Sequence, residues 1–194
     1  MTRTFDAVVI GCSAGGLEVL RPLVAALPAR FPLPVIIASH ISPEGGGLLA
    51  EVLSWSGALP IVEPHDKQAV LPGHVYIAPA NYHLLVEAER TFALSVDEQV
   101  CYARPSIDVL FMSAADVWGP HLVGVLLTGA NADGAAGLKA IREAGGLTIV
   151  QDPATAFADA MPNAAIQADA AQFILPVDEI ISAVPLLPLG KVPT

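Results

Sequence analysis

Short runs of apolar residues alternate along the chain with stretches in which apolar residues recur at helical spacing. One such stretch carries Leu17, Leu20, Val24 and Leu27 on one face, and another carries Leu48, Leu49, Val52 and Leu53. The apolar runs are typical of buried strands and cover residues 7–10, 35–38, 75–77, 123–127, 147–150 and 173–175. This alternation predicts βαβ units, and therefore an α/β fold with a doubly wound, mostly parallel sheet and helices on both faces.

Residues 83–96 depart from this pattern. Leu84 and Val86, and then Phe92, Leu94 and Val96, alternate at period two on either side of residues 88–90. This spacing predicts an antiparallel hairpin within an otherwise Rossmann-like arrangement. We expect the hairpin to make the sheet mixed at one place.

Several residues mark the predicted helix ends. Ser106 is placed to cap a helix that starts at Ile107, and the Gly145–Gly146 pair is placed to close the helix before it. Pro22 lies inside the first helical stretch, where it is expected to kink the helix or move its start downstream. We expect one domain over residues 1–184 and a flexible tail over residues 185–194, where three prolines interrupt any pattern.

Composition narrows the class of protein. The 194 residues suffice for one domain with a large core, and the formal net charge of −10 disfavours nucleic acid and anionic lipid as partners. Although 54% of the residues are hydrophobic, the apolar runs are far shorter than the roughly 18 residues that a membrane span requires, so no membrane insertion is expected. The chain starts without a secretory signal pattern and has only two cysteines, which together predict a cytoplasmic protein.

The first predicted strand runs into a glycine-rich turn at residues 11–16. The turn has the G-x-S-x-G spacing of a nucleophile elbow, with Ser13 as the exposed hydroxyl, but it also resembles a phosphate-binding turn of the dinucleotide type. Two features favour the elbow. Ser13 stands where the dinucleotide fingerprint has glycine, and the second strand ends in His40 instead of an acidic residue.

Asp133 follows the strongest later strand and has two interpretations. It is a good N-cap for the helix that follows, or it faces the crevice at the strand ends and orients His40. Because parallel strands end on one rim, Ser13, His40 and Asp133 are candidates for a nucleophile, a base and an orienting acid. The other histidines lack metal-ligand spacing, so no metal and no cofactor are expected.

The chain resembles the catalytic domain of the chemotaxis protein-glutamate methylesterase (CheB-type) family over nearly its whole length. The matching stretches are residues 10–16, His40 with Pro43, 72–79, 104–111, 126–129 with 133–135, 144–146, 151–152 and 161–166. The resemblance implies a serine esterase that removes glutamate γ-methyl esters from the cytoplasmic helices of chemoreceptors, releases methanol and also deamidates glutamine. It implies that Ser13 is the nucleophile, His40 the base and Asp133 its orienting partner. It further implies oxyanion donors at the backbone of Ala14 and Ala130, and substrate-site candidates Arg104, Ser106 and Met161.

Some positions depart from the family pattern. Val52 stands where arginine is usual, the loop at Ala130–Asn131 differs, and Ala160 replaces a glycine. Strand one begins by about Phe5, so the sequence predicts a stand-alone catalytic domain without a receiver domain, which leaves a separate receiver or signalling protein as a regulator. These departures keep two alternatives open: a non-catalytic docking or adaptor module, and an esterase that acts on another methylated protein. A dinucleotide-binding domain is the weakest alternative.

Overall fold

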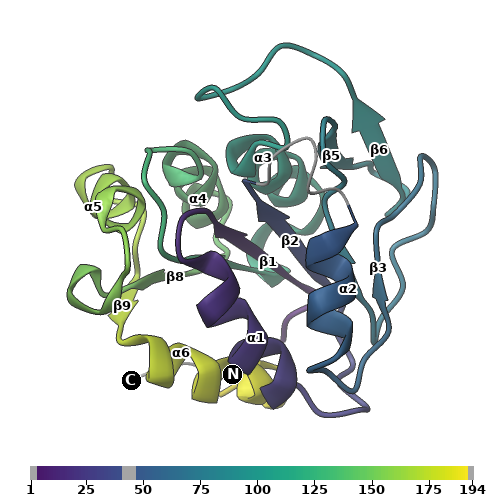
Figure 1. Ribbon diagram of the computed structural model, residues 1–194, viewed down its shortest axis with the longest axis horizontal. Helices are drawn as coiled ribbons and strands as arrows, with labels where there is room; N and C mark the ends of the chain where they lie inside the picture. Colours follow the sequence, from purple (N-terminus) through teal and green to yellow (C-terminus); the bar gives the residue numbers. More distant parts are fainter. Residues whose placement is uncertain (1–3, 41–46, 192–194) are drawn as a thin grey trace.

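The computed structural model describes residues 4–40 and 47–191 (Figure 1). Its main sheet has seven strands in the order β3-β4-β2-β1-β7-β8-β9, and every neighbouring pair is parallel. The strands of this sheet are β1 (Ala7–Cys12), β2 (Val35–Ser39), β3 (Ile61–Val62), β4 (Val75–Ile77), β7 (Leu122–Leu126), β8 (Leu147–Gln151) and β9 (Phe173–Leu175). The predicted α/β, doubly wound class is confirmed.

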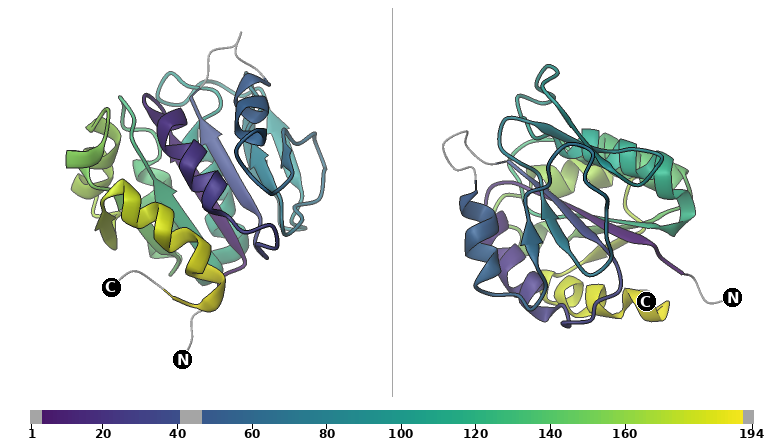
Figure 2. Two further views of the ribbon diagram at one scale, coloured as in Figure 1. Left: turned by 60° about the horizontal axis from the view of Figure 1, so that its bottom comes forward. Right: turned by 90° about the vertical axis from the view of Figure 1, so that its right-hand side faces the viewer.

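Helices cover both faces of the sheet, as Figure 2 shows. On one face lie α1 (Gly16–Ala26), α2 (Leu48–Ser54) and α6 (Val177–Ala183), and on the other lie α3 (Ile107–Trp118), α4 (Ala135–Glu143) and α5 (Ala160–Gln167). Each layer of helices encloses its own apolar core, so the side chains on both faces of a strand are buried. All six residues of β1 are buried. This two-sided burial explains why the strands read as unbroken apolar runs.

The predicted hairpin exists but does not join the main sheet. Strands β5 (His83–Val86) and β6 (Phe92–Ser95), drawn in teal in Figure 1, form a separate antiparallel sheet that packs on α3. The amide of Val86 donates to the hydroxyl of Ser113 on α3 at 3.1 Å, so the hairpin is tied to this helix. The expectation of a mixed main sheet is therefore wrong.

The structure adds detail at two places where prolines interrupt the pattern. Helix α1 starts at Gly16 and continues through Pro22. The proline removes the hydrogen bond to the carbonyl of Glu18, but Glu18 lies in an exposed turn where water can bind this carbonyl instead. The tail is not wholly irregular either: Val184–Leu189 forms a 3₁₀ helix in which Leu187 is fully buried. Shorter 3₁₀ helices lie at Gly119–His121 and Pro153–Thr155.

The sheet order places the predicted site. Strand β1 lies between β2 and β7, and the chain connects β1 to β2 on one side and reaches β7 on the other only after the hairpin and α3. The carboxyl ends of these three strands meet, since Cys12 pairs with Ser39 and Gly11 pairs with Leu126. In open α/β sheets such a switch in strand order leaves a crevice where ligands bind. No helix in the described ranges is both long and apolar enough to cross a membrane.

Candidate active site

Ser13 follows directly after β1, in a turn that leaves it partly exposed. Its amide donates to the carbonyl of Thr128 at 2.9 Å, which ties the turn to the end of β7. Gly15 has a φ of 78°, a left-handed conformation that glycine adopts without steric cost, and a Cβ there would lie 2.5 Å from Cβ of Phe157. The glycine therefore permits both the sharp turn and the close approach of Phe157, and α1 begins at the next residue.

His40 follows β2, the neighbour of β1 in the sheet. Its amide donates to the carbonyl of Cys12 at 3.2 Å, and Ser13 and His40 line one cavity of about 280 Å³. The His40 ring contacts the carboxylate of Asp133, with 2.7 Å between Nε2 and Oδ2. With Nε2 held by Asp133, Nδ1 is the ring nitrogen left without a hydrogen-bond partner among the described residues.

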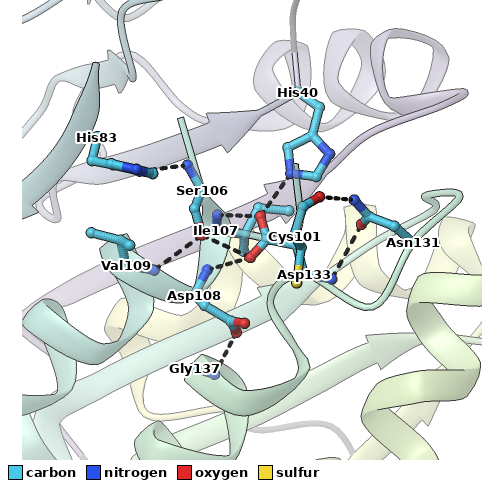
Figure 3. A network of polar contacts seen from close by, with 10 residues as sticks. All are labelled: His40, His83, Cys101, Ser106, Ile107, Asp108, Val109, Asn131, Asp133 and Gly137. Atoms are coloured by element: carbon cyan, nitrogen blue, oxygen red, sulfur yellow. Dashed lines mark hydrogen bonds and ion pairs between the residues drawn. The ribbon is translucent and has the colours of Figure 1, made fainter. Parts of the chain in front are cut away.

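Asp133 is fully buried and accepts four hydrogen bonds (Figure 3). Its Oδ1 accepts from the hydroxyl of Ser106 at 2.8 Å and from the amide of Asp108 at 3.0 Å. Its Oδ2 accepts from the amide of Ile107 at 2.7 Å and from His40. The first amides of a helix have no partner within the helix, so this carboxylate caps α3 from across the fold.

The N-cap interpretation of Asp133 was therefore right about capping but wrong about the helix. The N-cap of α4 is Gly134, with a φ of 93°, which has no side chain to cap the helix. Ser106 is the N-cap of α3, as predicted, and its hydroxyl also accepts from the amide of Val109 at 3.4 Å. Sequence spacing could not reveal that a residue before α4 completes the cap of α3.

The environment holds Asp133 in its charged form. Burial acts to raise the pKa of this carboxyl, but the hydrogen bonds from His40, the amides of Asp108 and Ile107, and Ser106 outweigh it and lower the pKa below its usual value. Burial raises the pKa of the neighbouring Asp108, and the charge of Asp133 adds to this rise. A 2.7 Å hydrogen bond from the amide of Gly137 acts in the opposite direction but does not cancel it.

His83 supports this network from the hairpin. It is almost fully buried; its Nδ1 accepts from the amide of Ser106 at 3.1 Å, and its Nε2 lies 2.9 Å from the carbonyl of Glu98 (Figure 3). These partners require a neutral ring with its proton on Nε2. The sequence spacing of His83 argued only against a role as a metal ligand, and the structure adds that it anchors the cap of α3.

The two expected oxyanion donors lie in loops that buried polar side chains hold in place. The Thr128 hydroxyl lies 2.9 Å from the carbonyl of Ala14 and accepts from the amide of Ala158 at 2.9 Å, and buried Gln151 accepts from the Thr128 amide at 2.9 Å. The amides of Ala14 and Ala130 donate to no other described residue. Both amides thus keep an unused donor, and Thr128 and Gln151, which sequence reasoning gave no role, fix the loops that carry them.

The structure separates the three substrate-site candidates. Ser106 and Met161 are both fully buried, and Met161 packs behind the loop glycine, where a Cβ on Gly129 would lie 2.5 Å from its Cε. Arg104 lines a cavity of the described part of the chain, together with His40. Val52 lines the cavity that contains Ser13. Pro43, part of the family motif, lies outside the described residues.

One group of possible metal ligands lies in the described part of the chain. Cys101, Asp108 and Asp133 each place a ligand atom within 4.8 Å of the others. Both oxygens of Asp133 already accept two hydrogen bonds, and the pKa of the Cys101 thiol is raised by burial and by the two carboxylates. A cation here would compete with the cap of α3 and with His40, so the donor set does not fit a metal centre.

Comparisons with known proteins find relatives over nearly the whole chain. A protein-family model described as CheB methylesterase matches residues 8–184. A relative from Leptospira interrogans, whose name assigns protein-glutamate methylesterase and protein-glutamine glutaminase activities provisionally, is 44% identical over 91% of each chain. The Symbiobacterium thermophilum protein-glutamate methylesterase/protein-glutamine glutaminase is 40% identical over 91% of this chain but only 49% of its own length. The crystal structure of the Thermotoga maritima CheB methylesterase catalytic domain matches with a TM-score of 0.88 and 32% identity, over 92% of this chain and 96% of that one.

Proposed function

The chain belongs to the CheB methylesterase family, and from this premise we propose that it hydrolyses glutamate γ-methyl esters on methyl-accepting chemotaxis receptors and deamidates receptor glutamines. The observation that carries the proposal is the contact of His40 with a buried, fourfold hydrogen-bonded Asp133, beside the serine turn. Structural capping alone does not require the histidine. The pair instead matches the base and orienting acid of a serine hydrolase.

The reaction follows from the roles of these groups. Ser13 attacks the ester carbonyl while Nδ1 of His40 takes its proton, and Asp133 stabilises the imidazolium through Nε2. The amides of Ala14 and Ala130 bind the oxyanion, and each such donor is worth on the order of 3 kcal/mol in the transition state. The imidazolium gives its proton to the leaving methanol, and His40 then activates water to release the glutamate carboxylate. With a glutamine side chain, ammonia leaves in place of methanol.

The lowered pKa of Asp133 suits this role. A carboxyl that is ionised at neutral pH accepts a hydrogen bond from the protonated Nε2. It therefore favours the tautomer in which Nδ1 is the base. Asn131 helps to hold it: its Oδ1 accepts from the amide of Asp133 at 3.1 Å, and its Nδ2 donates to the carbonyl of Cys101 at 3.3 Å. The loop that departs from the family pattern therefore still positions the acid, which supports an enzyme over a docking module.

Methanol release from methylated chemoreceptor cytoplasmic fragments tests the proposal. We expect turnover by the unmodified chain, none by Ser13→Ala, and unchanged turnover by Ser182→Ala, a control on the exposed side of α6. Cleavage of a small methyl ester without cleavage of receptor fragments would support the esterase that acts on another methylated protein. Partner binding without cleavage of either ester would favour the docking module.

A further inference from the structure

His40 lines two cavities, of which the second has the more polar lining. The cavity with Ser13 is walled by aliphatic side chains, among them Leu17, Leu48 and Val52, and Glu18 is the one carboxylate that lines it among the described residues. The second cavity, of about 340 Å³, is lined in part by amide side chains and by an arginine. A substrate whose ester reaches Ser13 therefore passes close to this polar cavity as well.

Amide side chains and one cation form the polar lining. Asn81, Gln99 and Asn131 contribute carboxamides, and Arg104 is the only lining residue with a permanent charge. No carboxylate lines the cavity, and Arg104 forms no ion pair within the described residues. In a chain with a net charge of −10, Arg104 is thus the cationic group that this lining offers to a negative ligand.

The guanidinium of Arg104 is held with one edge unused. Its Nη1 donates to the carbonyls of Val96 at 2.7 Å and Asp97 at 2.9 Å, which fixes its orientation. Its Nε is buried and has no hydrogen-bond partner, and Nη2 donates to no described residue. Because Nε is closed to solvent, a ligand reaches the guanidinium through Nη2, which offers a charge-assisted hydrogen bond to a carboxylate.

We propose that the polar cavity is a subsite for a second carboxylate of the substrate, bound by the Nη2 group of Arg104. The proposal rests on the proposed function, because it places the reacting ester at Ser13. A methyl ester is uncharged, so the reacting group itself gains little from a cation; the carboxylate belongs to a neighbouring acidic residue of the same substrate segment. Arg104 thus acts as a specificity residue that selects methylated glutamates with an acidic neighbour.

The test is a double-mutant cycle between enzyme and substrate. Helical peptides carry one γ-methyl glutamate and, at the neighbouring positions, either glutamate or glutamine. For the unmodified chain we expect kcat/KM to be about tenfold to a hundredfold higher for the acidic peptide, mainly through KM, since a charge-assisted pair is involved. In Arg104→Gln this preference disappears. In the exposed control Arg30→Gln it persists.

Three outcomes distinguish the possibilities. Equal loss for both peptides in Arg104→Gln would overturn the subsite and assign Arg104 to holding the 96–97 carbonyls. Equal turnover of both peptides by the unmodified chain would overturn it as well, while leaving the esterase intact. If no peptide is cleaved, the proposed function fails, and calorimetric titration of the demethylated acidic and neutral peptides into the unmodified chain and Arg104→Gln still decides the subsite, because this binding needs no turnover.

Discussion

Replacing Asp133 by asparagine tests the coupling between the catalytic pair and the cap of α3. The carboxylate uses both oxygens, each for one main-chain amide and one side chain. An asparagine has one oxygen, so in either orientation its NH₂ group faces a main-chain donor, Ile107 in one orientation and Asp108 in the other. When the NH₂ group faces Ile107 it also faces His40, and it then forces the ring into the opposite tautomer.

The expected cost follows from these contacts. One buried amide without a partner costs about 1–3 kcal/mol, and the remaining bonds lose their charge assistance. We expect the free energy of unfolding to fall by about 2–4 kcal/mol, which leaves a domain of ordinary stability folded. We expect kcat to fall by between about 10² and 10⁴, because the imidazolium of His40 loses its counter-charge in both orientations and its correct tautomer in one.

Urea unfolding and methanol release measure the two effects separately. Asp152→Asn is a matched control: Asp152 caps a 3₁₀ helix through the amide of Ala154 at 2.9 Å, and asparagine caps equally well, so both quantities should stay within about 0.5 kcal/mol of their original values. Near-normal turnover in a folded Asp133→Asn protein would remove Asp133 from the mechanism. Unchanged stability would refute its role as the cap of α3.

The same variant makes a prediction about pH. Because the folded pKa of Asp133 lies below the unfolded value of about 3.9, its ionised form contributes stability that is present above that value and is lost as pH falls through the folded pKa. The stability difference between the original chain and Asp133→Asn should therefore be constant near neutral pH and shrink below about pH 4. Urea midpoints measured from pH 7 to pH 3 check this, and a difference that grows on acidification would contradict it.

Three further predictions concern residues around the site. Ser106→Ala removes the N-cap of α3 and one donor to Asp133, so the unfolding free energy should drop by about 1–3 kcal/mol in urea, with a smaller loss of kcat than in Asp133→Asn. Gly15→Ala places a Cβ at a φ of 78° and 2.5 Å from Phe157, so methanol release should fall sharply, and adding Phe157→Ala should restore only part of it because the backbone strain remains. A thiol reagent at pH 8 should label exposed Cys101 in the native chain and reach Cys12 only in denaturant, since burial raises the pKa of the Cys12 thiol to about 11.

Much of the architecture could be predicted from local patterns. The apolar runs identified six of the seven strands of the main sheet, and only the two-residue β3, which has little pattern to recognise, was missed. Period-two alternation identified the hairpin, and the glycines at 145 and 146 identified the end of α4, where their amides bond to Arg142 and Ile141. These features depend on residues near one another in the chain, so periodicity and turn chemistry suffice to find them.

The sequence by itself also predicted that Ser13, His40 and Asp133 lie close together, because residues that follow parallel strands lie along one edge of the sheet. Only the tertiary structure decided what surrounds them. Asp133 caps α3 and not its own helix, Ser106 faces the carboxylate instead of a substrate, and His83 supports the cap from a sheet of its own. These contacts join residues that are 23 to 27 positions apart in the chain. A polar residue's sequence neighbours determine its local propensity, whereas the packing of distant elements determines which unsatisfied amide or ring nitrogen it meets.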